Sequence, residues 1–308
     1  NPDMDTKKNT KEASKKTIGI LCALTGGMLW GISGVCGQYL FQNKGVTATW
    51  LVPIRLTSAG LFLLLYFLLR DHKRALSVWK EKRNAKDILV YAIAGMMLCQ
   101  YSYFQTIEWS NAGTATVIQY LGSAMTVVYI CISERQRPKR KEILAVLLAL
   151  CGIFLIATHG KPGSLALSGR ALGMGLLSAV GLVIYTVKPR RLLTQFPSPL
   201  ILAWGMLIGG IVLSAVMRPW NHMPQIDAEL IGVLLVIICL GTMASFSLYL
   251  HSVSLIGPVQ AGLYACIEPV AATVFSVIWM KETFVAIDLL GFVLIIATVF
   301  VLAAPEKE

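Results

Sequence analysis

The sequence predicts an all-α polytopic membrane protein with ten transmembrane helices in two inverted five-helix repeats. Three observations lead to this fold class: an apolar composition, ten apolar stretches long enough to cross a bilayer, and a weak similarity between the two halves of the chain. Of the 308 residues, 56% are hydrophobic and 14% are charged, with a mean hydropathy of +0.68. Soluble domains are typically about 25% charged, so this composition excludes an ordinary water-soluble enzyme.

Ten stretches are candidate spans, because a helix needs about 20 mostly apolar residues to cross the hydrocarbon core. In chain order they are 17–42, 46–69, 87–109, 112–132, 142–158, 169–188, 198–217, 228–251, 258–279 and 285–303. The connections between them are short, so no folded soluble domain is expected. Residues 1–16 are polar and rich in lysine, and we expect them to form a disordered cytoplasmic tail.

The basic residues are distributed unevenly between the two sides of this predicted bundle. With the N-terminus in the cytoplasm, 21 of the 27 Lys and Arg residues fall in cytoplasmic segments and five in external segments. This asymmetry follows the positive-inside rule, so we expect a multi-pass protein of the plasma (cytoplasmic) membrane with both termini in the cytoplasm. The net charge of +11 then reflects topology and contact with anionic lipid, and it indicates no nucleic-acid partner.

The two halves of the chain align weakly at an offset of 146 residues. At this offset the break after the third stretch, residues 107–115, lies over residues 253–261, and Tyr103 lies over Tyr249. Each half holds five spans, an odd number, so the second half enters the membrane from the opposite side. Inverted repeats of this kind are typical of secondary transporters, whose site lies near the middle of the membrane. We therefore place the two repeats at 17–160 and 169–304.

Two charged residues lie near the middle of predicted spans, where charges are costly and usually functional. Arg55 lies in the second stretch, and Glu268 lies in the ninth, directly before the helix-loosening Pro269. The repeat positions of these two charges hold Gly205 and Gly122, so neither is duplicated, which points to substrate chemistry. Two interpretations of Glu268 stay open: a cavity carboxylate that binds a proton or a cationic substrate, or one half of a buried ion pair with Arg55.

Other polar and aromatic residues of the spans are candidates to line the same cavity. Tyr264 precedes Glu268 by four residues, a spacing that puts both on one face of a continuous helix. The remaining candidates are Gln119, Trp30, Gln38, Tyr101, Tyr103 and Tyr185. Plain helix packing is the alternative for each aromatic residue. Gathered around one acid, they would suit an amine or an aromatic metabolite through cation–π contact.

The sequence contains none of the common catalytic or cofactor-binding patterns. It has no phosphate-binding G-x-x-x-x-G-K-[ST] loop, no G-x-S-x-G nucleophile elbow and no H-E-x-x-H metal pattern. Its seven cysteines all fall within predicted spans, and none forms a C-x-x-C pair. We therefore expect no enzymatic activity, no metal and no cofactor.

Several of these segments together resemble the EamA family of the drug/metabolite transporter superfamily. They are the glycine-rich Gly27–Gly34 segment, Arg55 in the second stretch, and Glu268-Pro269 in the ninth. The resemblance covers the chain after residue 17 and implies a ten-helix transporter of amino acids or other small metabolites, commonly an exporter. Arg55 and Glu268-Pro269 match the family pattern, whereas residues 121–123 read Leu-Gly-Ser where many members have a proline.

We therefore predict a secondary active transporter that exports small metabolites, such as amino acids or amines, by alternating access. Its partners are a small-molecule substrate, protons carried by Glu268, and the lipid bilayer, and we expect it to be a monomer. An uptake permease and a multidrug exporter are alternatives of the same fold. A membrane protein that binds a small molecule without transporting it is a more distant alternative.

Overall fold

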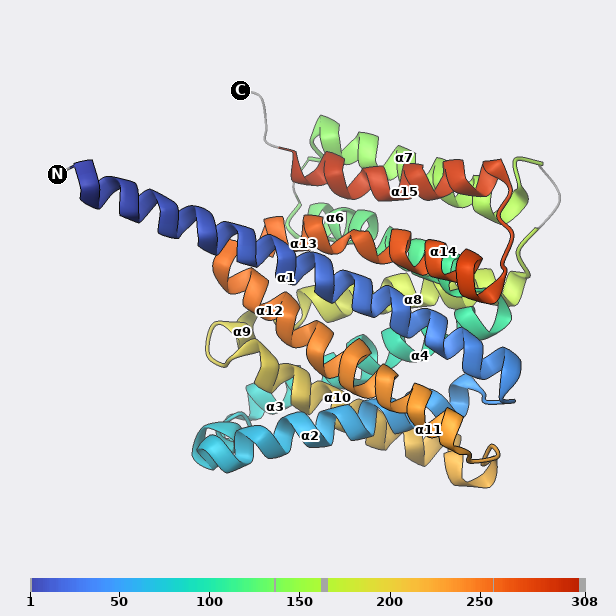
Figure 1. Cartoon of the computed structure of the whole chain (residues 1–308), viewed down its shortest axis with the longest axis horizontal. Helices are drawn as coiled ribbons and strands as arrows, with labels where there is room; N and C mark the ends of the chain where they lie inside the picture. The colour runs from blue at the N-terminus through green and yellow to red at the C-terminus, as the bar shows by residue number, and fades with distance from the viewer. Residues whose placement is uncertain (1, 136, 162–165, 257, 305–308) are drawn as a thin grey trace.

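The helices of this protein run roughly along one axis and pack side by side (Figure 1). The computed structural model describes residues 2–135, 137–161, 166–256 and 258–304, and these ranges are helical and contain no strand. The N- and C-terminal ends of the chain both lie at the left end of the bundle in Figure 1. We call this the terminal end and the other the far end.

The helices fall on the ten apolar stretches expected from the sequence, although several stretches are divided by a break or by a wider π-helix. The elements are α1 (Pro2–Asn43), α2 (Ala48–Ser77), α3 (Lys82–Val90), η1 (Tyr91–Met97, a π-helix), α4 (Leu98–Trp109), α5 (Ala112–Gln119), α6 (Leu121–Ser133), α7 (Arg140–Thr158), α8 (Gly169–Val187), α9 (Arg190–Leu193), α10 (Ser198–Met217), η2 (Pro219–Asn221, a 3-10 helix), α11 (Ala228–Leu235), η3 (Val236–Ala244, a π-helix), α12 (Ser245–Ile256), α13 (Pro258–Ala265), α14 (Ile267–Met280) and α15 (Ala286–Ala303).

Polar side chains begin three of these helices. The side chains of Asn111, Ser168 and Asp227 each accept a hydrogen bond from a backbone N–H in the first turn of α5, α8 and α11, respectively. The first N–H groups of a helix lack partners within it, and a capping oxygen supplies one. All three caps lie in short connections, so they set where the chain re-enters the bundle.

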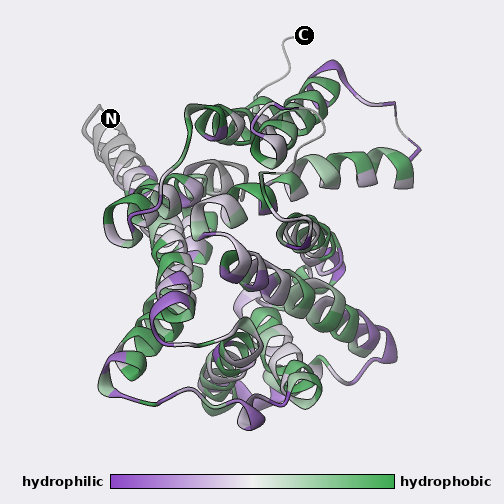
Figure 2. Cartoon of the chain, turned by 90° about the vertical axis from the view of Figure 1, so that its right-hand side faces the viewer, coloured by the Kyte–Doolittle hydropathy of each residue, from purple (hydrophilic) through white to green (hydrophobic). Residues whose placement is uncertain are grey.

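Seven helical segments are long and apolar enough to cross a membrane. They are Ser14–Asn43, Ala48–Ser77, Ala112–Ser133, Arg140–Thr158, Gly169–Leu193, Ser198–Met217 and Ala228–Ile256, and Ile267–Met280 and Ala286–Leu302 are shorter apolar helices. Large apolar side chains such as Leu69 (88% exposed) and Ile132 (73% exposed) face outward. Figure 2 shows hydrophobic residues along the helices and hydrophilic residues mainly in the connections. A multi-pass membrane protein has this surface, because lipid and not water surrounds its helices.

The packing of the helices has a regular pattern. In the lower part of Figure 1, α2 lies along α10, and at the top α7 lies along α15. The first helix, α1, packs against α12 and α14, and the sixth apolar stretch, α8, packs against α4 and α6. The neighbours of α1 belong to the eighth and ninth apolar stretches, and those of α8, the sixth stretch, belong to the third and fourth. Moving five stretches along the chain therefore relates the two sets of neighbours.

The irregular backbone of the bundle also recurs at a fixed interval. The π-helix η1 begins at Tyr91, and η3 begins 145 residues later, at Val236. The break between α5 and α6 falls at Tyr120, and the break between α13 and α14 falls at Cys266, an interval of 146 residues. The interval agrees with the offset at which the two halves of the sequence align.

Two glycines allow α2 and α10 to approach each other closely. A Cβ atom on Gly60 would lie 2.7 Å from the Cα of Leu207, and a Cβ atom on Gly210 would lie 2.9 Å from the Cα of Thr57. Real Cβ atoms essentially never come this near backbone, so only glycine permits this spacing. Because 57 and 207, like 60 and 210, differ by 150, the contact is symmetric between the halves.

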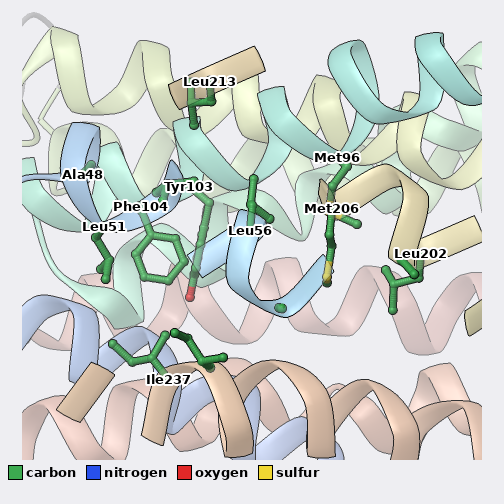
Figure 3. Packing of buried hydrophobic residues seen from close by; sticks show 14 of the residues in the cluster. Ala48, Leu51, Leu56, Met96, Tyr103, Phe104, Leu202, Met206, Leu213 and Ile237 are labelled. Carbon is green, nitrogen blue, oxygen red and sulfur yellow. The ribbon is translucent and has the colours of Figure 1, made fainter. Parts of the chain in front are cut away.

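A large apolar core surrounds this contact. Figure 3 shows Leu51 and Leu56 of α2, Phe104 of α4, Met206 of α10 and Ile237 of η3, all fully or nearly fully buried, in one cluster. A smaller cluster joins α5, α6, α7, α8 and α15. Interdigitated side chains are the main source of helix association in membranes, since lipid supplies no hydrophobic driving force.

The start of α1 differs from the expected disordered tail, because α1 begins at Pro2. Residues 2–16 therefore continue the helix that the apolar residues after 17 form. Lys, Glu and Ala of this segment have good helix propensity, and the following helix supplies a nucleus that an isolated segment lacks. The division of the chain into a tail and two repeats at 17–160 and 169–304 stays a prediction.

Substituting Gly210 with alanine tests the close approach of α2 and α10. We expect Gly210→Ala to lower the free energy of unfolding by about 1–3 kcal/mol, because the added methyl group forces α2 away. Gly173→Ala is the matched control, since nothing lies within 4 Å of its Cβ position. Thermal unfolding of the purified variants in detergent measures both changes, and an equal effect of the two substitutions would contradict the close contact.

Candidate functional site

A cavity of about 500 Å³ lies inside the bundle. Residues of α1, α2, α4, α8, α12 and α15 line it, together with residues at the breaks between α5 and α6 and between α13 and α14. Its polar and aromatic wall comprises Trp30, Ser33, Arg55, Gln100, Tyr103, Gln119, Tyr120, Tyr185, Tyr249 and Glu268. The volume is in the range of small-molecule sites, and both halves of the chain contribute to the wall.

The cavity brings together six of the nine residues that the sequence singled out. Those six are Trp30, Arg55, Tyr103, Gln119, Tyr185 and Glu268. The other three, Gln38, Tyr101 and Tyr264, do not line it. A role in substrate binding stays a prediction for each of the nine.

Arg55 is buried in the cavity wall and is held by polar groups of two other helices. Its Nε donates to the Thr242 hydroxyl oxygen at 2.9 Å, and its Nη1 donates to the Gln100 amide oxygen at 2.7 Å. The guanidinium carbon lies 4.8 Å from the centre of the Phe104 ring. Thr242 lies in η3 and Gln100 follows η1, so the two π-helices flank the arginine.

Glu268 lies in the first turn of α14, just beyond the break at Cys266. Its Oε2 accepts a hydrogen bond from the Tyr120 hydroxyl at 3.0 Å, and Tyr120 occupies the break between α5 and α6. Among the described residues, Glu268 and Arg55 form no ion pair with each other. The structure therefore does not form the Arg55–Glu268 pair that was one interpretation, and each charge has neutral partners.

Aromatic rings form much of the remaining wall. The Trp30 ring lies 4.9 Å from Phe246 and 5.2 Å from Tyr249, measured between ring centres. Tyr185 stacks on Tyr91 at 5.4 Å. The wall thus combines a broad aromatic surface with one cation and one acid.

Gln38 has structural partners outside the cavity. It is fully buried near the far end of α1, where its amide oxygen accepts from the Ala112 N–H at 2.9 Å. Its amide nitrogen donates to Glu282 at 2.7 Å. Gln38 thereby joins α1 to the start of α5 and to the connection after α14.

The two remaining tyrosines point elsewhere for different reasons. Tyr101 donates a hydrogen bond to Gln105, one turn along α4, at 3.1 Å. Tyr264 was expected on the face of Glu268, but α13 ends at Ala265 and α14 begins at Ile267. The break interrupts the helical register between the two residues, so their spacing of four no longer puts them on one face.

The cavity extends to the terminal end of the bundle. Thr186 and Leu302 belong to its wall and lie in the last turns of α8 and α15, which end at the terminal end. Arg55 lies in the far half of α2, as Phe104 does in α4. The cavity therefore runs from the arginine towards the terminal end.

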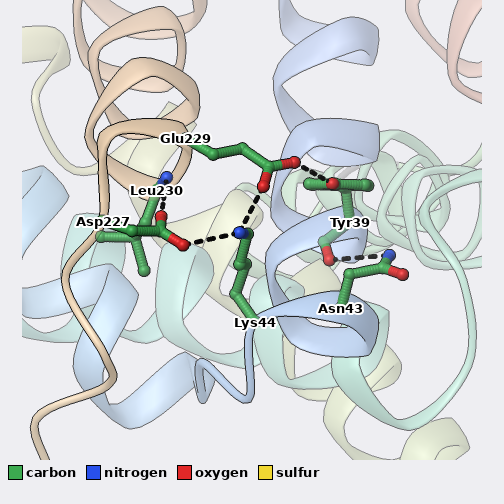
Figure 4. A network of polar contacts seen from close by, with 6 residues as sticks. All are labelled: Tyr39, Asn43, Lys44, Asp227, Glu229 and Leu230. Carbon is green, nitrogen blue, oxygen red and sulfur yellow. Dashed lines mark hydrogen bonds and ion pairs between the residues drawn. The ribbon is translucent and has the colours of Figure 1, made fainter.

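A network of polar contacts joins two helices at the far end (Figure 4). Lys44, in the connection after α1, contacts Asp227 at 2.8 Å and also Glu229, while Tyr39 of α1 donates to Glu229. The Tyr39 ring stacks on Trp279 of α14 at 5.1 Å. We call Tyr39, Lys44, Asp227 and Glu229 the far-end network; it ties the end of α1 to the start of α11.

Tyr120, Thr242 and Ser33 are residues of this site that the sequence did not single out. A signal was available for Tyr120, which lies two residues before Gly122, the repeat counterpart of Glu268. Thr242 and Ser33 carried no such signal, because small hydroxyl residues are common in membrane helices and usually bond their own backbone.

Comparison with known proteins places this fold and site in context. The model of the EamA-like transporter family matches residues 17–158 and 169–304. The chain is 34% identical over 290 residues to YicL of Salmonella typhimurium, named an uncharacterized inner membrane transporter, and the match covers 94% of this chain and 96% of that one. It is 19% identical to the uncharacterized transporter YetK of Bacillus subtilis, over 96% of this chain and 89% of that protein.

A solved crystal structure has a similar fold. It superposes with a TM-score of 0.60 at 16% sequence identity, and the match covers 94% of this chain and 96% of that one. At this identity the likeness concerns the fold alone.

Substituting Gln38 tests its structural role. We expect Gln38→Leu to destabilise the protein by about 1–3 kcal/mol, because it leaves the buried Ala112 N–H without its acceptor and removes the shorter of the two amide contacts to the Glu282 carboxylate. Gln42→Leu is the control, since Gln42 is exposed and shares only the Glu282 contact, at 3.3 Å. Thermal unfolding in detergent compares them, and a Gln38→Leu variant as stable as Gln42→Leu would rule out the structural role.

Proposed function

The chain belongs to the EamA-like transporter family, and on this premise we propose that it is a secondary active transporter exporting small metabolites by alternating access. It is a multi-pass membrane transporter and not an enzyme. We propose amino acids or amines as the substrate class, with uptake and broad drug export as alternative modes of the same fold.

We further propose that the ten helical stretches all cross the membrane as two inverted five-helix repeats. The matched neighbours of α1 and α8, the symmetric contact of α2 with α10, and the recurring π-helices and breaks support this layout. Each of these features in the first half of the chain has a counterpart five apolar stretches later, in the second half. Five spans per repeat require opposite orientations of the two halves in the membrane.

The terminal end is proposed to face the cytoplasm. Both chain ends lie there in Figure 1, as does the connection between α2 and α3. The basic residues of the segments 70–86, 135–141 and 188–191 belong to this end. Cytoplasmic segments carry an excess of Lys and Arg, which supports this orientation.

The observation that carries the transport proposal is the cavity between the two halves, whose wall reaches the last turns of α8 and α15 at the terminal end, while the far-end network ties the halves together at the other end. Alternating access requires such an arrangement, in which one end of a central site is closed while the other is open. The described conformation then corresponds to the cytoplasm-facing state. A single chain supplies both halves, so the proposed unit is a monomer.

Glu268 is the proposed proton carrier, and Glu268→Gln tests this role. The glutamine keeps an oxygen for the Tyr120 hydrogen bond but cannot ionise. We expect the variant to lose the dependence of flux on an imposed pH gradient, measured in proteoliposomes with a substrate found by a thermal-shift screen of amino acids and amines. Glu81→Gln, on an exposed glutamate at the start of α3, is the control. Undiminished pH-driven flux in Glu268→Gln would exclude Glu268 as the carrier.

The far-end network predicts a pH-dependent contribution to stability. Hydrogen bonds that Lys44 donates to Asp227 and Glu229 raise the pKa of the Lys44 amine, and the bond from Lys44 lowers the pKa of the Asp227 carboxyl. Because the carboxyl pKa is lowered on folding, its contribution to stability is complete above the unfolded pKa and is lost as the pH falls through the folded pKa. Because the amine pKa is raised on folding, its contribution is complete below the unfolded pKa and is lost as the pH rises through the folded pKa. The network therefore contributes most between roughly pH 5 and 10.

We accordingly expect Lys44→Met to lower the melting temperature at neutral pH. The difference from the unmodified protein should shrink below about pH 4, where the carboxyl groups become protonated. Lys80→Met, on an exposed lysine at the terminal end, should show no such pH-dependent difference. A deficit of Lys44→Met that stays constant across this range would exclude the charge interaction as its cause.

A further inference from the structure

Arg55 is a buried cation with no carboxylate in direct contact among the described residues, and Glu268 lies in the wall of the same cavity. Its side chain is 4% exposed, and its partners are the neutral Thr242 and Gln100 together with the Phe104 ring. No carboxylate forms an ion pair with it within the described residues. A buried charge is normally paired, and its polar neighbours here replace only part of its hydration.

The partners of Arg55 also leave one part of the guanidinium available. Nε and Nη1 are engaged, whereas Nη2 makes no hydrogen bond among the described residues. The Thr242 hydroxyl donates to the Ile237 carbonyl at 2.9 Å, so its oxygen is committed to Arg55. Arg55 is thus held in place with a donor still to be satisfied.

Two other unused donors belong to the same cavity wall. The Ser33 hydroxyl and the Trp30 indole N–H are buried, and neither has a hydrogen-bond partner in the described part of the chain. A Cβ atom on Gly241 would overlap the Ser33 side chain, so Ser33 lies against the residue that precedes Thr242. Buried donors without partners are rare in proteins, and several in one cavity indicate a ligand rich in acceptors.

We propose that Arg55 binds the carboxylate of the substrate, with Ser33 and Trp30 donating further hydrogen bonds to it. A carboxylate supplies both the missing negative charge and up to four acceptor sites. The rings of Trp30, Phe246 and Tyr249 contact the apolar body of the same molecule. The ligand class is therefore small organic carboxylates with an apolar body, and amines that lack an acid group do not bind.

This inference rests on the proposed function, because it narrows the substrate class of the transport cavity. It makes the acid group of a substrate essential and its amine dispensable. Glu268 accepts its hydrogen bond from Tyr120, so the substrate carboxylate and not Glu268 contacts Arg55 directly.

Binding of three matched probes tests the proposal: phenylpropanoate, its neutral amide, and the cation phenylpropylamine. We expect the acid to raise the melting temperature of the purified protein and to bind at least about tenfold more tightly than the amide or the amine, since a hydrogen-bonded charge is lost in both. Equal binding of the amide or the amine, or no binding of the acid, would overturn the proposal.

Variants assign the preference to Arg55. Arg55→Gln should bind the acid and the amide equally, and Arg55→Lys should keep part of the preference for the acid. Arg70→Gln is the control and should keep all of that preference, since Arg70 lies exposed towards the other end of α2. An acid preference retained in Arg55→Gln would overturn the assignment; if that variant does not fold, Arg55→Lys and the three probes on the unmodified protein still decide. Flux in proteoliposomes is measured separately: an acid that binds but does not cross the vesicle membrane contradicts transport and leaves the carboxylate site standing.

Discussion

Backbone hydrogen bonds that cannot be given to water constrain this bundle more than any other interaction. In a bilayer every N–H and C=O group must find a partner within the protein, so irregular backbone is tolerated only where it faces other protein or a wet cavity. The breaks at Tyr120 and Cys266 line the cavity, and η1 and η3 lie directly beside the cavity residues Gln100 and Phe246. These four departures from α-helix thus lie in the cavity wall or within two residues of it.

The same departures from α-helix position the polar side chains that contact Arg55 and Glu268. The π-helix η3 carries Thr242 to Arg55, and the break before α14 carries Glu268 to Tyr120. π-Helical segments are known to accompany functional sites, because the extra residue re-aims the side chains that follow it. Each charge is thereby held from a different half of the chain: Arg55 of the first half bonds Thr242 of the second, and Glu268 of the second half bonds Tyr120 of the first. Relative motion of the halves would therefore alter both charges together.

Different interactions are found at the two ends of the bundle. At the far end, exposed charges of the far-end network and the buried amide of Gln38 join the halves. At the terminal end α8 and α15 both contribute residues of their last turns to the cavity wall. Salt and pH act on the exposed charges and leave the buried glycine contact of α2 with α10 unaffected.

The sequence by itself determined the all-helical, multi-pass character of the chain and the two charges that lie within its apolar stretches, Arg55 and Glu268. Hydropathy and charge cost are local properties that each residue carries wherever its helix packs, so a single chain reveals them. Only the tertiary structure decided that these two charges have separate neutral partners, that Gln38 belongs to the packing of the far end, and that Tyr264 is turned from the face of Glu268. Those outcomes depend on helix rotation and on breaks in register, which arise from contacts between residues 45 to 244 positions apart, and no periodicity within one helix encodes them.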